Sequence, residues 1–232
     1  MKMKKVFFAA LATVIGFSMA ACDTGSNDVR IDLPPAGDGS ITFAPGDPPM
    51  TFPVVDRYGD PVALGGTMNF TRMWGGEDNG DYWADMSDII PNSVVSLSAD
   101  GVLSLILGTP TELWPLVDLF ENGVPRGISI TAGLRVFIIE NFSSTDDYFL
   151  VWRTLPDQYN WGGVDFFYAD RAGTVMGIIE DEYVISRVNM ELSPGWNTVI
   201  ATEEWNPVSG REYHTMVTGR PGDNFKWILR DY

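Results

Sequence analysis

The sequence predicts an all-β protein, an antiparallel β-sandwich or β-barrel with one short helix. Many short segments are rich in Val, Ile, Phe, Tyr and Trp, and Gly, Asn, Asp or Pro separate them, as is typical of sandwiches and barrels. Asp100-Gly101 lies between two apolar alternations, which is a strong hairpin signal. Hydrophobic residues make up 45% of the chain, which excludes general disorder.

The expected strands alternate or are continuously apolar over about four to ten residues. They span 67–73, 93–98, 102–107, 128–131, 135–140, 148–154, 164–169, 174–179, 183–192, 197–202, 213–218 and 225–229. Ser193-Pro194-Gly195 is a tight turn between two of them. Trp114, Trp152, Trp196 and Trp227 are expected to anchor the core or turns.

One segment has helical periodicity. Thr111 can cap it, and apolar residues recur on one face at positions 113, 116, 117 and 120. Asn122-Gly123 supplies a stop signal. We therefore expect a short helix over residues 111–122 that covers one end of the β structure.

The first 21 residues have the features of an export signal. Three lysines in the first five residues precede an apolar stretch that is shorter than the ~20 residues of a membrane-spanning helix. The stretch ends in Met19-Ala20-Ala21-Cys22, which resembles the lipobox of bacterial lipoproteins, with Met19 in place of the usual Leu. This resemblance covers residues 1–22 only.

The lipobox resemblance implies cleavage before Cys22 and acylation of that cysteine, the only one in the chain. The expected organisation is a signal peptide over residues 1–21, a lipidated Pro/Gly-rich tether over 22–66 and an all-β domain over 67–232. The partner that this implies is a lipid bilayer, held through the acylated Cys22. We expect an extracytoplasmic, lipid-anchored protein of the cell envelope, at the outer membrane or cell surface in preference to the inner membrane.

The chain is strongly acidic. Its formal net charge is −16, and loss of residues 1–21, with three lysines and no acidic residue, makes it −19. Such a surface is repelled by nucleic acid, so nucleic acid is excluded as a partner. The charge serves solubility or favours cations and basic partners.

Metal ligands are scarce except for carboxylates. With His214 as the only histidine and Cys22 as the only cysteine, a Cys/His zinc site cannot form within one chain. Asp78, Asp81 and Asp85 lie close together and are weak candidates for Ca²⁺, the only cofactor that we consider. The segment lacks EF-hand spacing, and a solvated acidic loop is the default interpretation.

Aromatic residues in Gly/Asn/Asp-rich segments are the main functional hint. Flat rings beside amides and carboxylates suit a glycan, whereas the simpler interpretation is that they cap the open ends of the core. The candidate ligand-binding residues are Trp74, Tyr82, Trp83, Trp161, Trp205 and Glu203.

Catalytic signals are weak, and we name no catalytic residue. No Gly-x-Ser-x-Gly elbow surrounds a serine, and His214 sits in a strand-like run, where a histidine is usually structural. A glycan hydrolase needs two carboxylates, and the many acidic residues do not single out a pair, although Glu203-Glu204-Trp205 is the best single candidate.

The globular part shows one short resemblance. Residues 192–199 (Leu-Ser-Pro-Gly-Trp-Asn-Thr-Val) resemble a turn-and-strand motif of uncharacterised exported β-rich lipoproteins, which carries no known activity. We therefore expect a non-catalytic lipoprotein that binds a glycan, a small apolar molecule or an envelope partner. A carboxylate-dependent glycan hydrolase and a purely structural or adhesive envelope protein are the alternatives.

Overall fold

The protein is nearly all β, as predicted. The computed structural model describes residues 33–43, 47–74, 83–120, 123–144, 148–155 and 160–231. Within these ranges, only the backbone is described at residues 74, 83 and 84. Strands account for 55% and helical residues for 5%. Within the part of the chain that the structure describes, no helix is both long and apolar enough to cross a membrane.

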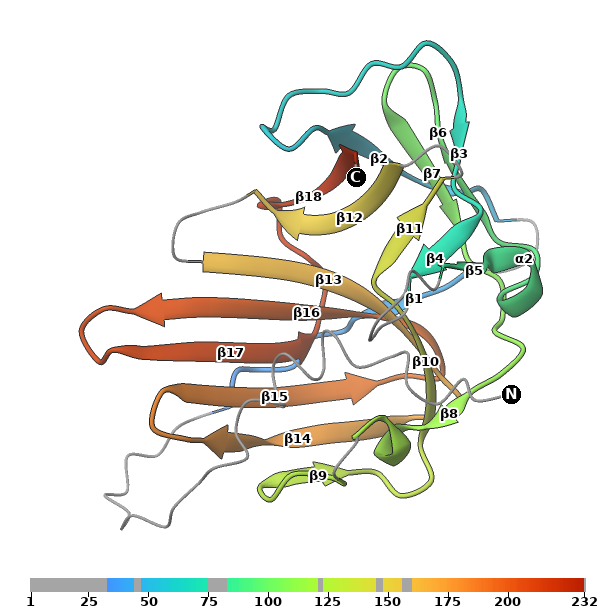
Figure 1. The fold of residues 1–232 in the computed structure, drawn as a ribbon. Coiled ribbons are helices and arrows are strands. Elements are labelled where there is room, and N and C mark those ends of the chain that lie inside the picture. The colour runs from blue at the N-terminus through green and yellow to red at the C-terminus, as the bar shows by residue number, and fades with distance from the viewer. Residues whose placement is uncertain are drawn as a thin grey trace.

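One group of strands forms a curved sheet (Figure 1). Neighbouring strands are antiparallel, except that β15 and β17 run parallel. β1 (Ser40–Ile41) pairs with β16 beyond the point where β17 leaves it. The order across the sheet is β8 (Trp114–Pro115), β10 (Arg135–Ile139), β13 (Asn160–Ala169), β16 (Gly195–Asn206), β17 (Arg211–Thr218), β15 (Val184–Leu192), β14 (Gly173–Glu180) and β9 (Ile128–Ile130).

The second group of strands packs beside the first. β12 meets β13 at one pair, Arg153 with Gly163, and β18 pairs with β2 in parallel. The order across this group is β5 (Trp83–Asp85), β4 (Arg72–Trp74), β11 (Asn141–Ser143), β12 (Tyr148–Thr154), β18 (Phe225–Asp231), β2 (Met50–Val55), β7 (Val102–Ile106), β6 (Val94–Leu97) and β3 (Met68–Asn69).

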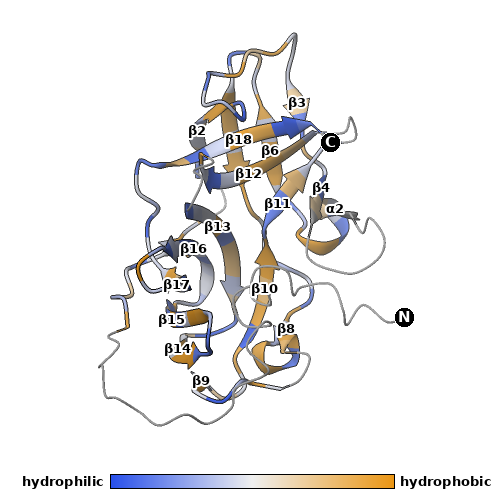
Figure 2. Cartoon of the chain, turned by 60° about the vertical axis from the view of Figure 1, so that its left-hand side comes forward, coloured by the Kyte–Doolittle hydropathy of each residue, from blue (hydrophilic) through white to orange (hydrophobic). Residues whose placement is uncertain are grey.

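Strand β10 is the wall between two hydrophobic cores. Successive side chains of a strand point to opposite faces, so Val136 and Ile138 enter one core while Phe137 and Ile139 enter the other. We call these the lower core, inside the curved sheet, and the upper core, under β2, β6, β7 and β18. Figure 2 shows β10 as a hydrophobic strand that joins the two parts of the molecule.

The prediction of a helix over residues 111–122 is wrong. Trp114 pairs with Val136 as strand β8, and Pro115 has extended torsions of φ −55° and ψ 127°. Only one 3-10 turn, η1 (Leu116–Leu119), follows, although Leu116 and Phe120 are buried in the lower core as the periodicity implied. Bonding to the neighbouring strand therefore overrides the helical pattern.

A short helix is present elsewhere, over α2 (Met86–Ile89). Asp85 is its N-cap, because its carboxylate accepts hydrogen bonds from the Ser87 backbone N–H at 3.0 Å and from the Ser87 hydroxyl at 2.9 Å. These bonds lower the pKa of Asp85.

Part of the predicted tether lies within the folded body. β1 and β2 belong to the sheets, and the Asn189 side chain donates to the Pro34 carbonyl at 2.8 Å. A Cβ at Gly39 would stand 2.5 Å from the Thr198 carbonyl oxygen. The glycine is thus required by close backbone approach, which composition alone does not distinguish from a flexible linker.

We expect Phe137→Ala to destabilise the fold by about 3–5 kcal/mol, because its ring is fully buried and stacks on Trp114 at a centroid distance of 5.3 Å. Val208→Ala, at a side chain that is 95% exposed, should change stability by less than about 0.5 kcal/mol. Urea unfolding monitored by circular dichroism measures both. Equal losses of unfolding free energy in the two variants would contradict the contribution of the buried Phe137 side chain to the core.

Candidate functional site

Five candidate side chains lie on one face of the adjacent strands β13, β16 and β17. Figure 1 shows β16 and β17 as a hairpin beside β13. Trp161 of β13 is opposite Glu203 of β16, and Glu203 is opposite His214 of β17. Trp205 is likewise opposite Glu212. Because residues two apart on a strand share a face, these five project to the side of the lower core. We call them the rim cluster.

The turn of the hairpin sets this register. The Asn206 side-chain oxygen accepts hydrogen bonds from the backbone N–H groups of Val208 at 2.9 Å and Ser209 at 3.2 Å. Gly210 has a φ of 66°, which glycine adopts without strain, and its N–H donates to the Asn206 carbonyl at 2.9 Å. A one-residue slip of this turn would turn Glu212 and His214 to the opposite face.

Trp161 is held flat against its own strand. A Cβ at Gly163 would lie 3.0 Å from the Trp161 ring, so the absence of a side chain there gives the indole its place. The Arg153 guanidinium lies 4.9 Å from the ring centroid, within cation–π range. One indole is therefore fixed by packing, whereas Trp205 is 44% exposed.

His214 is the buried member of the rim cluster. Only 4% of it is exposed, and neither ring nitrogen has a hydrogen-bond partner. Its Nε2 is 3.4 Å from Glu212 Oε2, close enough for a charge contact although the geometry is not that of a hydrogen bond. One donor atom each from Glu203, Glu212 and His214 lie within 4.8 Å of one another. Among the residues that the structure describes, these three form a group that could hold a metal ion.

Ionisable groups with shifted pKa values lie next to the rim cluster. Burial is the main cause that lowers the pKa of Arg153, and Asp165 and Glu140 oppose that shift. Burial and the charge of Glu140 raise the pKa of Asp165 well above its ordinary value, against the effect of Arg153. Burial also raises the pKa of Glu203, His214 and Arg153 oppose that shift, and Glu212 adds to it.

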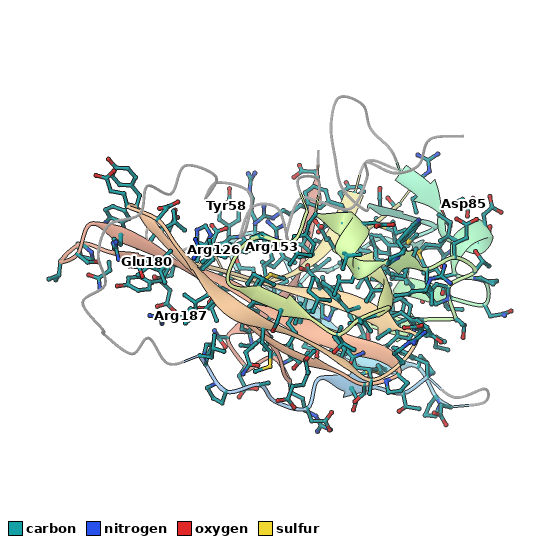
Figure 3. All side chains as sticks on the ribbon, turned by 90° about the horizontal axis from the view of Figure 1, so that it is seen from below. Tyr58, Asp85, Arg126, Arg153, Glu180 and Arg187 are labelled. Atoms are coloured by element: carbon teal, nitrogen blue, oxygen red, sulfur yellow. The ribbon has the colours of Figure 1, made fainter. Side chains whose placement is uncertain are left out.

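The structure brings together three of the predicted site residues, Trp161, Trp205 and Glu203. Trp74 and Trp83 form a backbone pair between β4 and β5, which belong to the second group of strands. The side chains of both residues are outside the described structure. Cys22, Asp78, Asp81 and Tyr82 also lie outside the described residues. Asp85, the remaining calcium candidate, caps α2 at the end of the molecule remote from Arg153 (Figure 3).

Sequence reasoning missed Glu212 and Arg153 and treated His214 as structural. The signal was present in part, because Glu212 and His214 are two apart in a strand and therefore share a face. Only the pairing register with β16 shows that Glu203 joins them.

Comparison with known proteins adds no relative. No family model, curated protein or solved structure matches the chain. The chain is therefore described as an all-β protein that carries a cluster of acidic and aromatic side chains on its curved sheet.

We expect Asp165→Asn to remove a pH dependence of stability. A carboxyl whose folded pKa is raised stabilises the folded state below its unfolded pKa, and this stabilisation is lost as the pH rises through the folded pKa. The variant should match the wild type near pH 4 and become the more stable protein as the pH rises. Thermal unfolding from pH 4 to 8 measures the difference. A variant that loses stability relative to the wild type at high pH would instead show an ionised Asp165 paired with Arg153.

Proposed function

We propose that this protein is a lipid-anchored extracytoplasmic protein that binds a glycan at the rim cluster. The observation that carries the proposal is the exposed Trp205 ring beside Glu203 and Trp161 on one face of adjacent strands. A flat ring can stack on a sugar face, and carboxylates accept hydrogen bonds from its hydroxyls.

A small apolar ligand in a barrel lumen has less support. The inner face of the curved sheet is occupied by the protein's own side chains, including Phe167, Met190 and Met216. Leu116 and Phe120 of the segment around η1 pack against them. An apolar ligand would have to displace this packing, whereas a glycan at the rim cluster would not.

The anchor part of the proposal rests on the lipobox resemblance. Cys22 precedes the folded body by only about ten residues, because Pro34 already bonds to β15. In its acylated form the domain would therefore stay close to the membrane surface, and we place it at the outer membrane or cell surface.

A second candidate is a carboxylate-dependent glycan hydrolase. Donor oxygens of Glu203 and Glu212 lie within 4.8 Å of each other, near the ~5 Å separation of retaining enzymes. Burial raises the pKa of Glu203, as a general acid requires. Release of reducing ends from a bound glycan, lost in Glu203→Gln, would favour this candidate.

We expect Cys22→Ser to abolish acylation. Without the thiol there is no sulfur to which the lipid can be attached. Labelling with a clickable palmitate analogue in a Gram-negative host measures the effect. Undiminished labelling of the variant would exclude Cys22 as the acylation site.

We expect Trp205→Ala to weaken glycan binding about tenfold or more, because it removes the exposed ring. A glycan array probed with the Cys22→Ser protein identifies the ligand, and calorimetry measures the affinity. Trp205→Phe should retain part of the affinity, and Val208→Ala, at the tip of the same hairpin, should retain all of it. Binding to no glycan would leave the structural or adhesive alternative.

A further inference from the structure

We propose that Glu203, Glu212 and His214 bind a divalent transition-metal ion such as Zn²⁺. The inference goes beyond glycan binding and does not depend on it. It is carried by a buried imidazole without hydrogen-bond partners that lies beside two carboxylates, Glu212 on its own strand and Glu203 on the paired strand.

The first argument is geometric. The donor atoms of the three side chains already lie within 4.8 Å of one another, as ligands of a common ion must. All three residues come from the paired part of β16 and β17, on either side of a turn that fixes their register. Strand-borne ligands are positioned more precisely than ligands on loops, so little rearrangement is needed for binding.

The second argument is the state of His214. A buried polar atom without a partner is costly, and a native structure usually satisfies it. His214 is 4% exposed, yet both its nitrogens lack a hydrogen bond. Its Nε2 lies 3.4 Å from a Glu212 carboxylate oxygen, and a donor atom of Glu203 is also within 4.8 Å of the ligand atoms of the other two residues. A metal ion bound by these atoms would satisfy a ring nitrogen and both carboxylates together.

The third argument is charge. Glu203 and Glu212 are brought together at a half-buried position, where like charges repel more strongly than in water. The Arg153 guanidinium, outside the proposed ligand set, lies against the Trp161 ring. A divalent cation would balance the two carboxylates directly.

The donor set selects the type of ion. Ca²⁺ and Mg²⁺ prefer oxygen ligands alone, whereas an imidazole nitrogen favours Zn²⁺ and its first-row neighbours. Three protein ligands leave a fourth tetrahedral position open, as in zinc sites that bind an exogenous oxygen.

The test is metal binding by the Cys22→Ser chain that begins at residue 22 and is stripped with chelator. This protein keeps the whole domain and has no thiol that could bind the metal. Calorimetric titration with Zn²⁺ should give one site per chain, and the same titration with Ca²⁺ should give none. Co²⁺ should give visible d–d absorption bands typical of a low-coordinate nitrogen–oxygen site.

Two ligand variants and one matched control make the test specific. His214→Gln and Glu212→Gln should each weaken Zn²⁺ binding roughly 100-fold or more, because each removes a direct ligand. Glu204→Gln is the control, because Glu204 is the neighbour of Glu203 but projects to the opposite face and is exposed. Since Glu212 is half-exposed, its variant should fold even if substitution of the buried His214 does not.

The result that would overturn the proposal is the absence of a Zn²⁺ site in the folded protein, or undiminished binding by Glu212→Gln and a folded His214→Gln. Equal affinity for Ca²⁺ would also overturn it. Trp205→Ala should keep the Zn²⁺ site, so loss of glycan binding and loss of metal binding are separate outcomes. Failure of the glycan array leaves the metal result intact, and the converse also holds.

Discussion

The pairing of β13 with β16 is the interaction on which the rest of the structure depends. The two strands match over ten consecutive residue pairs, from Asn160 with Glu204 to Ala169 with Gly195. This ladder carries β10 on one side and β17 on the other, so it sets the curvature of the sheet around the lower core. It also decides which residues point inward. The same alternation that buries Phe167 and Val199 brings Trp161 and Glu203 side by side at the rim.

The rim cluster lies where the lower core ends. Met216 and Ala201 belong to that core, and the next inward residues on their strands are His214 and Glu203. An apolar face thus passes into a polar one within two residues. The polar end contains more ionisable groups than closing a core requires, with Arg153, Asp165 and Glu140 interacting behind it. Buried ionisable groups of this kind are expensive to charge unless they are paired or used, and this is the reason for proposing a function here.

Local patterns allowed much of the fold to be predicted, because strands with period-two burial and Asp-Gly turns carry their own signal. Strand β12 over Tyr148–Thr154 and the hairpin around Gly101, with its φ of 77°, appear where expected. The helix over 111–122 failed because Trp114 bonds to β10 across a long stretch of sequence. The site was found only in part for the same reason. Trp161 and Trp205 stand out by composition, whereas the union of Glu203, Glu212 and His214 depends on strand register.

The parallel pairing of β15 with β17 has a consequence for how the chain is completed. Only Ser193 and Pro194 join β15 to β16, yet β17 lies between those two strands and bonds to both. Strand β17 thus acts as an intramolecular donor strand, which fills the slot between β15 and β16. Until residues 211–218 arrive, β15 and β16 present unpaired edges to each other. During synthesis from the N-terminus, the curved sheet therefore stays incomplete between β15 and β16 until residues 211–218 are available.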